Sequence, residues 1–179
     1  MIRYFIFKTL FGWMGVVGGR KGLKRIILPH AKRAAVKKII FEEFPGVEEN
    51  SSHLRLLADI LGKYFEGKKF TRGFAFDATG FTDFLVTVWK TTQTIPWGEV
   101  RSYQWLSTQI KNPGSFRAVG RALGKNPFPL VVPCHRIIRK DGTLGGFSAP
   151  EGILLKQRLL QLEGVRFDSK GRVIGFKKK

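Results

Sequence analysis

The 179-residue sequence is poor in cysteine, in acidic residues and in long apolar runs. Its single cysteine forms neither an intrachain disulfide nor a Cys-x-x-Cys pair, which excludes disulfide scaffolds, cysteine-rich zinc sites and thioredoxin-type chemistry and indicates a reducing compartment. The apolar stretch from Leu10 to Val17 is too short to span a bilayer and contains Gly12 and Gly15. We expect strands there, in place of a signal peptide or a membrane anchor.

The residues that are present are enough for a packed core. A hydrophobic fraction of 43% and 16 Phe exclude intrinsic disorder, collagen-like repeats and coiled coils. The length fits one domain or two small ones.

Basic residues outnumber acidic ones, 32 to 13, and they are unevenly placed. Residues 1–40 contain ten Lys or Arg and no acid, and residues 101–140 contain eight and no acid, whereas residues 41–70 contain six acids and four bases. This charge fits a generally basic soluble surface or a polyanion partner. The interleaved Tyr103, Trp105 and Phe116 favour nucleic acid, and membrane-surface binding is a weaker alternative.

The first half of the chain indicates strands followed by helices. Apolar runs at 2–8, 13–17 and 23–28 predict a small antiparallel sheet. Helical periodicity follows at 31–44 and at 54–65, where Ser51 or Ser52 is a candidate cap. The turn-rich segment before Gly80 predicts a domain boundary near residue 79.

The second half predicts helices with irregular connections. Thr82, Ser102 and Ser115 are candidate caps for helices at 84–95, 103–110 and 116–125, and Pro96 ends the first of them. The last two form a helix-turn-helix pattern, which is also common in purely structural helical domains. The second helix has a basic stripe at intervals of four residues, made by Arg117, Arg121 and Lys125.

The lone cysteine follows a proline-rich approach. Three prolines in eight residues predict an extended chain from Asn126 to Pro133. Cys134 is either a small core residue or a nucleophile whose thiol pKa is lowered by His135 and Arg136. Neighbours in a strand point to opposite faces, so the nucleophile requires either a bend after Pro133 or a bridging water.

The motifs PCHRII (133–138), NPFPLVV (126–132), GTLGGFS (142–148) and LLQLEG (159–164), together with PWGEVRSY (96–103) and RAVGRAL (117–123), resemble those of the O6-alkylguanine-DNA alkyltransferases. The resemblance is strong over residues 82–164 and looser before residue 79. It implies an α+β fold with a ribonuclease H-like N-terminal domain (1–79), which has a small antiparallel sheet and helices. A mainly helical C-terminal domain (80–179) with a winged-helix-like helix-turn-helix follows.

By the same resemblance, the protein rotates an alkylated guanine out of duplex DNA and transfers the alkyl group irreversibly to Cys134. His135 acts as the base through a water, Glu163 orients the imidazole, and Asn126 ties the end of the recognition helix to the active-site strand. Asn126 beside Pro127 can alternatively start a turn.

The resemblance also assigns residues that touch DNA and the lesion. Arg117 fills the gap left by the flipped base, and Tyr103 crowds the phosphate and donates to guanine, unless Tyr103 merely packs on the core. The wider DNA-binding set is Tyr103, Ser115, Arg117, Arg121 and Lys125. The lesion pocket set is Tyr103, Pro129, Ile137, Ser148 and Lys156, and we expect Lys156 to pair with the helix of Glu163 or with the pocket loop.

The pocket loop departs from the family pattern, and the sequence also bears on metal and cofactor binding. Ala149, Pro150 and Glu151 lengthen the pocket loop and should stiffen and acidify it. The three histidines, at positions 30, 53 and 135, have no ligand spacing, so we expect no metal, and the chain has no phosphate-cradling loop or cofactor motif.

The expected partner is double-stranded DNA with O6-alkylguanine, and O4-alkylthymine is a second candidate. We expect a monomer without an obligatory protein partner or a membrane, in the cytoplasm with the nucleoid, or in the nucleus of a eukaryote. A DNA-binding regulator or lesion sensor would explain the charge but not Cys134 and His135, and a thiol hydrolase would explain those two but not Arg117.

Overall fold

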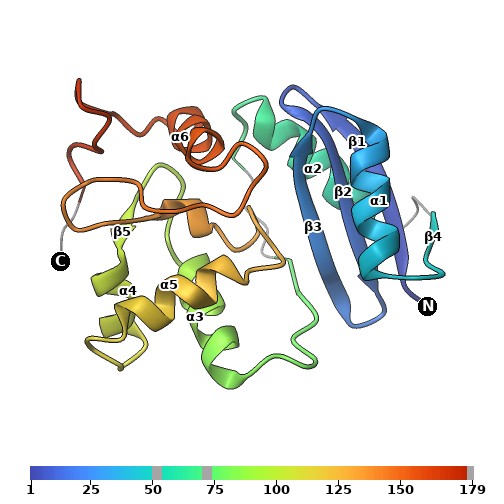
Figure 1. Ribbon diagram of the computed structural model, residues 1–179, viewed down its shortest axis with the longest axis horizontal. Helices are drawn as coiled ribbons and strands as arrows, with labels where there is room; N and C mark the ends of the chain where they lie inside the picture. The colour runs from blue at the N-terminus through green and yellow to red at the C-terminus, as the bar shows by residue number, and fades with distance from the viewer. Residues whose placement is uncertain (50–53, 70–73, 177–179) are drawn as a thin grey trace. The chain divides into compact units, whose positions relative to one another are not determined.

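The computed structural model describes residues 1–49, 54–69 and 74–176 (Figure 1). They form two compact units. The first contains Met1–Asp77 and the short segment Pro127–Pro129, and the second contains Ala78–Asn126 and Leu130–Lys179.

A four-stranded sheet forms the centre of the first unit, in the order β3-β2-β1-β4. Strands β1 (Arg3–Thr9), β2 (Gly12–Gly19) and β3 (Gly22–His30) pair antiparallel, as the apolar runs predict. The sheet is nevertheless mixed, because β4 (Glu48–Glu49) pairs parallel with β1. Two exposed glutamates carry no hydrophobic alternation, so this strand was not predicted.

Glycine is required where β1 turns into β2. Gly12 has φ +131°, and a Cβ there would lie 2.6 Å from the carbonyl oxygen of His30. Any other residue would be strained in this conformation and would collide with backbone.

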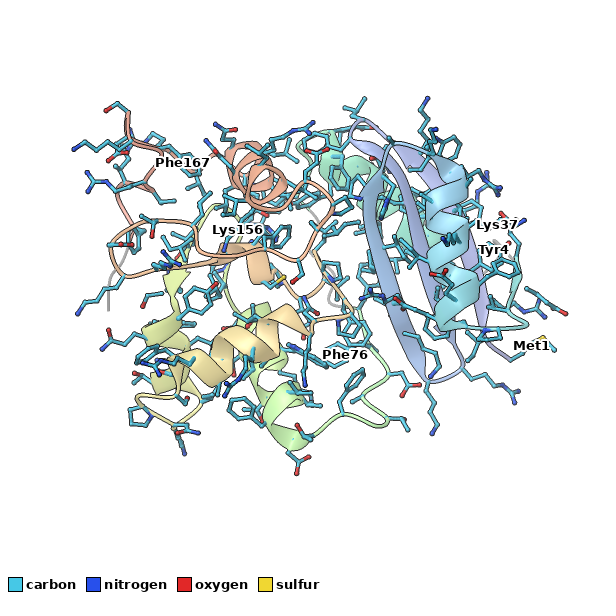
Figure 2. The ribbon with its side chains drawn as sticks, viewed as in Figure 1. Met1, Tyr4, Lys37, Phe76, Lys156 and Phe167 are labelled. Atoms are coloured by element: carbon cyan, nitrogen blue, oxygen red, sulfur yellow. The ribbon has the colours of Figure 1, made fainter. Side chains whose placement is uncertain are left out.

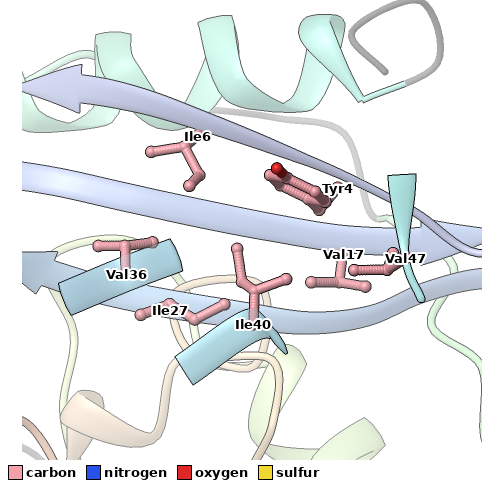
Figure 3. Packing of buried hydrophobic residues seen from close by; sticks show 7 residues of the cluster. All are labelled: Tyr4, Ile6, Val17, Ile27, Val36, Ile40 and Val47. Carbon is pink, nitrogen blue, oxygen red and sulfur yellow. The ribbon is translucent and has the colours of Figure 1, made fainter. Parts of the chain in front are cut away.

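Helices α1 (Arg33–Glu43) and α2 (Arg55–Phe65) complete the first unit and match the predicted ranges. Ser51 and Ser52 lie outside the described residues, and Leu54 occupies the N-cap position of α2 without a side-chain cap. Apolar residues of the sheet and of α1 pack together in a core (Figure 3), which consists of Tyr4, Ile6, Val17, Ile27, Val36, Ile40 and Val47.

The second unit is mainly helical. Its elements are α3 (Asp83–Gln93), β5 (Arg101–Ser102), α4 (Tyr103–Gln109), α5 (Phe116–Gly124), the 3₁₀ turn η1 (Cys134–Arg136), β6 (Ile137–Ile138) and α6 (Ile153–Leu162).

The predicted caps of α3 and α4 are confirmed. Thr82 accepts a hydrogen bond from the Leu85 amide at 3.4 Å, and Ser102 accepts one from the Trp105 amide at 2.9 Å. Ser115 occupies the N-cap position of α5 but does not cap it with its side chain: its backbone, at ψ 19°, lacks the extended conformation of a capping residue, and its hydroxyl donates to the Asn112 carbonyl at 2.6 Å.

Helices α4 and α5 form the predicted helix-turn-helix. The turn between them places Lys111 at φ +56° and Gly114 at φ +85°. Helix α5 buries Val119, Ala122 and Leu123, and the indole of Trp89 in α3 donates to the Ala122 carbonyl at 3.0 Å. Helix α3 therefore holds the buried face of α5 in place, and the opposite face of α5 is exposed to solvent.

A short parallel pairing links the start of α4 to the cysteine segment. Arg101 of β5 pairs with Ile137 of β6, and Ser102 pairs with Ile138. Because Tyr103 follows Ser102 and Cys134 precedes Ile137 by three residues, this pairing brings the first turn of α4 near the thiol.

Among the described residues, no helix has the length and the apolar character that a membrane crossing requires.

The helices and the small sheets together confirm the expected α+β class.

Candidate active site around Cys134

The chain bends sharply on both sides of Pro133. The expected extended run from Asn126 to Pro133 is wrong, because the backbone turns at Leu130, which has φ +72°. Proline fixes its own φ and restricts only the residue before it, so Leu130 after Pro129 remains free to turn. After Pro133, Cys134 enters the 3₁₀ turn η1, which is the bend that a reactive Cys–His pair requires.

Asn126 connects the end of α5 with the thiol. Its side chain is buried and follows Lys125, the C-cap of α5. The amide nitrogen Nδ2 donates to the carbonyl of Val132 at 3.0 Å and to Sγ of Cys134 at 3.3 Å. The bond to Val132 orients the Asn126 amide, and the bond to Sγ fixes the thiol relative to the end of α5.

Behind the thiol lies a buried cluster of three charged or titratable side chains. His135, Arg136 and Glu163 are 0%, 7% and 4% exposed. Oε1 of Glu163 lies 2.7 Å from Nε2 of His135, and the Arg136 guanidinium donates through Nε at 2.8 Å and Nη2 at 2.9 Å. The Gly98 amide donates to the same carboxylate at 3.2 Å, so Glu163 accepts from three directions.

The cluster sets the protonation of its members. Burial alone would raise the pKa of Glu163, but the charges and hydrogen bonds of His135 and Arg136 hold this pKa well below its usual value. Burial lowers the pKa of His135 and outweighs the charge and hydrogen bond of Glu163, which act to raise it; the positive charge of Arg136 adds to the lowering. At neutral pH the pair is therefore an ionised carboxylate and a neutral imidazole. Since a carboxylate only accepts, Nε2 carries the proton and Nδ1 is the basic nitrogen.

The thiol itself is not activated at rest. Burial raises the pKa of Cys134, and the Asn126 hydrogen bond and the positive charge of Lys156 oppose this shift only in part. The expected lowering of this pKa is wrong as a net effect: the backbone of His135 does lower it, but the side chains of His135 and Arg136 are directed to Glu163. Cys134 is consequently a thiol until a base removes its proton.

Lys156 of α6 is enclosed within the second unit (Figure 2), with 0% exposure. Its ammonium donates to the carbonyl of Ile137 at 2.5 Å and to that of Leu144 at 2.6 Å. Burial lowers the pKa of Lys156 to about 8, and the charge of Cys134 opposes this shift. Of the two expected partners, the ammonium thus contacts the GTLGGFS loop, through Leu144, and no hydrogen bond to Glu163 is among its contacts, because Glu163 is occupied by His135 and Arg136.

Tyr103, the first residue of α4, lies near the thiol. Burial raises its pKa, and the neighbouring Cys134 charge adds to the shift. A Cβ on Gly145, which has φ +71°, would lie 3.1 Å from the Tyr103 hydroxyl. The GTLGGFS loop therefore approaches this hydroxyl closely because it has glycine at position 145.

The structure brings most of the predicted site residues together, with one exception. Cys134, His135, Asn126 and Glu163 are joined by hydrogen bonds or by sequence, and Tyr103, Ile137 and Lys156 surround them. Pro129 belongs to the other unit, with residues 1–77. Sequence reasoning missed the role of Arg136 and of the Gly98 amide. A glutamate buried against one histidine requires further donors, and the arginine next to that histidine was the available signal.

The predicted DNA-facing residues lie along α5. Arg117, Arg121 and Lys125 are all exposed, and Ser115 is half-buried. Ser148 is exposed near the end of this helix, since a Cβ on Gly124 would lie 3.9 Å from its hydroxyl. Within residues 1–49, 54–69 and 74–176, no cluster of three His, Cys, Asp or Glu side chains could hold a metal ion.

Residues 83–165 match the family model described as 6-O-methylguanine DNA methyltransferase, DNA binding domain. The methylated-DNA–protein-cysteine methyltransferase of Methanosarcina barkeri is 37% identical over 161 residues, which cover 89% of this chain and 96% of that protein. The protein of the same name from Shigella flexneri is 45% identical over 108 residues, 60% of this chain and 62% of that protein.

The crystal structure of Mycobacterium tuberculosis OGT in complex with DNA matches with a TM-score of 0.74 and 34% identity, over 90% of this chain and 92% of that chain. The similarity thus extends through both units and includes the cysteine segment. The chain belongs to the methylated-DNA–protein-cysteine methyltransferase family.

Proposed function

We propose that this protein repairs DNA by transferring the alkyl group of O6-alkylguanine to Cys134, once per chain. The observation that carries the proposal is the arrangement at η1. A cysteine held by Asn126 is followed by a buried neutral histidine, which is itself held by an ionised glutamate. A cysteine with only a packing role requires none of these partners.

The proposed reaction begins with proton transfer. Nδ1 of His135 accepts the thiol proton through a water, and Glu163 stabilises the imidazolium that forms. The thiolate attacks the alkyl carbon, so that a C–S bond forms and the C–O6 bond breaks. The electron pair of the broken bond stays with guanine, which then takes a proton at N1 from water. Tyr103 donates a hydrogen bond to the charge that develops on the base.

The raised pKa of Cys134 suits this order of events. A resting thiol is a weak nucleophile, which protects the protein from alkylation and oxidation before the lesion arrives. The thioether product has no carbonyl for water to attack, so the cysteine is not regenerated. Lys156 lies near the thiol and would stabilise the transient thiolate electrostatically.

The partner in this proposal is double-stranded DNA. The basic stripe on α5 is exposed and available for phosphates. Because the O6 position is enclosed in the base stack, the nucleotide must rotate out, and Arg117 takes the vacated place. Ser115, Arg121 and Lys125 contact the backbone, and O4-alkylthymine is a second candidate lesion.

We further assign residues 80–179 to a DNA-binding and alkyl-transfer domain with a winged-helix-like helix-turn-helix, and residues 1–79 to an N-terminal α/β domain of ribonuclease H type. Ile137 and Ser148 border the lesion pocket, and Ala149–Glu151 form its lid. A salt bridge between Glu151 and Arg158 at 2.8 Å compensates the acidic charge of that lid. The protein acts as a monomer in the compartment that holds the DNA, which is the cytoplasm of a prokaryote or the nucleus of a eukaryote.

Incubation with an excess of duplex carrying one O6-methylguanine, followed by intact mass and peptide mapping, tests the proposal. We expect repair to stop at one equivalent per chain, with one methyl group on Cys134. Turnover beyond one equivalent, or complete repair with unmodified Cys134, would refute the mechanism. Binding without any transfer would instead identify a lesion sensor or regulator.

A further inference from the structure

Helix α5 buries most of its large apolar side chains and exposes one of them, Phe116. Phe116 is the first residue of α5 and is 47% exposed, whereas Val119, Ala122 and Leu123 are buried. Its neighbour Arg117 is exposed as well. A large aromatic ring beside a cation on an open helix face is a common arrangement in surfaces that bind nucleic acids.

The position of Phe116 on the helix relates it to the candidate active site. Residues four apart lie on one face of a helix, so Phe116, Gly120 and Gly124 form a row. A Cβ on Gly120 would lie 3.7 Å from the Tyr103 ring, and one on Gly124 would lie 3.9 Å from the Ser148 hydroxyl. Phe116 therefore stands at the end of a row that passes two proposed pocket residues.

The charge around this row indicates which partner covers it. Arg117, Arg121 and Lys125 form the adjacent row, and residues 101–140 contain no acid. Such a surface attracts a polyanion, but phosphates offer nothing to a phenyl ring. Within a nucleic acid, the apolar surface available to Phe116 is the face of a base.

We propose that Phe116 inserts against the base step next to the flipped nucleotide, as an apolar wedge beside Arg117. The inference rests on the proposed DNA-repair function. Minor-groove proteins use apolar side chains in this way to unstack a base step, which lowers the cost of extruding the neighbouring nucleotide. Phe116 thus opens the stack and Arg117 fills it.

Duplex binding and duplex repair by Phe116→Ala test the wedge. We expect the loss of base contact to weaken duplex binding about tenfold, in line with base–aromatic stacking. The slope of log affinity against log salt should stay unchanged, because no phosphate contact is lost. Arg121→Ala should reduce that slope by about one. Phe116→Leu, which keeps an apolar wedge, should recover most of the affinity.

Phe41→Ala is the matched control, since Phe41 is 42% exposed and belongs to α1 of the first unit, whereas Phe116 belongs to α5 of the second. Transfer from the free base O6-methylguanine should remain at the wild-type rate in Phe116→Ala, because a free base requires no unstacking. Duplex affinity equal to that of Phe41→Ala, or equal losses on duplex and free base, would overturn the wedge. Failure of the wild-type protein to methylate Cys134 would overturn the proposed function instead, and the binding comparison would still decide the role of Phe116.

Discussion

Replacing Glu163 by Gln should destabilise the protein far more than its small chemical change implies. Gln keeps the size of the side chain but removes the charge that holds Arg136 at 2.8 and 2.9 Å. It also presents an amide donor to a guanidinium that only donates. Breaking a buried ion pair from one side costs about 3–5 kcal/mol, because the remaining charge stays desolvated.

Glu151→Gln provides a control with the same substitution and the same 2.8 Å distance to an arginine. The side chains of Glu151 and Arg158 are 43% and 44% exposed, so that pair should contribute less than about 1 kcal/mol. Urea denaturation followed by circular dichroism measures both free energies of unfolding. The double variant Glu163→Gln/Arg136→Met should regain part of the loss, because it no longer buries a lone cation.

The pH dependence gives the same prediction an independent readout. The folded-state pKa of Glu163 lies below its unfolded value of about 4.3. Its contribution is therefore present above pH 4.3 and is lost as the pH falls below that value. The stability difference between wild type and Glu163→Gln should narrow on acidification. A loss below about 1 kcal/mol at pH 7, or a double variant as unstable as the sum of both single variants, would refute the view of Glu163 as the counter-charge of Arg136.

Three further predictions concern the site. Cys134→Ser should abolish methyl transfer and leave duplex affinity near that of wild type, since the thiol offers little contact area; residual transfer near the wild-type rate would exclude Cys134 as the nucleophile. Arg117→Ala should slow repair in duplex much more than transfer from free O6-methylguanine, and equal losses would show a structural role. Asn126→Ala should raise the thiol pKa further, because the Asn126 hydrogen bond lowers it; alkylation by iodoacetamide at pH 7 should become slower, and an unchanged rate would contradict the contact.

Periodicity and cap residues were sufficient to locate most elements of this fold. The ranges of β1 to β3 and of α1 to α3 followed from apolar spacing, and those of α4 and α5 from the residues that precede them, whereas no range was predicted for α6. Strand β4 carries no such signal, because its two residues are exposed glutamates with no apolar alternation. Their contacts with Arg3 and Tyr4 of β1 come from residues distant in the sequence. Residues 165–176 were likewise not predicted, although Val165 and Val173 pack in a core cluster.

The candidate site was predictable as a set of residues but not as a set of contacts. The PCHR motif points to Cys134 and His135, yet motif letters do not say where a side chain is directed. Arg136 and Lys156 illustrate the limit. The arginine was expected to act on the thiol and instead holds Glu163. Two partners were expected for the lysine, the helix of Glu163 or the pocket loop, and its ammonium donates to Leu144 of the GTLGGFS loop and to Ile137.

The path of the chain restricts how this protein can be divided. The backbone leaves the second unit after Asn126, contributes Pro127–Pro129 to the first, and returns at Leu130. Within the first unit the carbonyl of Pro127 accepts from the Ile26 amide at 2.8 Å, and the Phe128 ring stacks on Phe76 at 4.6 Å. No single cut of the chain therefore yields two complete units. A fragment that starts at residue 80 would contain Phe128, which is fully buried in the intact protein, but neither β3 nor Phe76, which contact this segment. Insertions and circular permutations that must interrupt the chain should therefore be placed elsewhere, at the exposed Leu10 in the turn between β1 and β2.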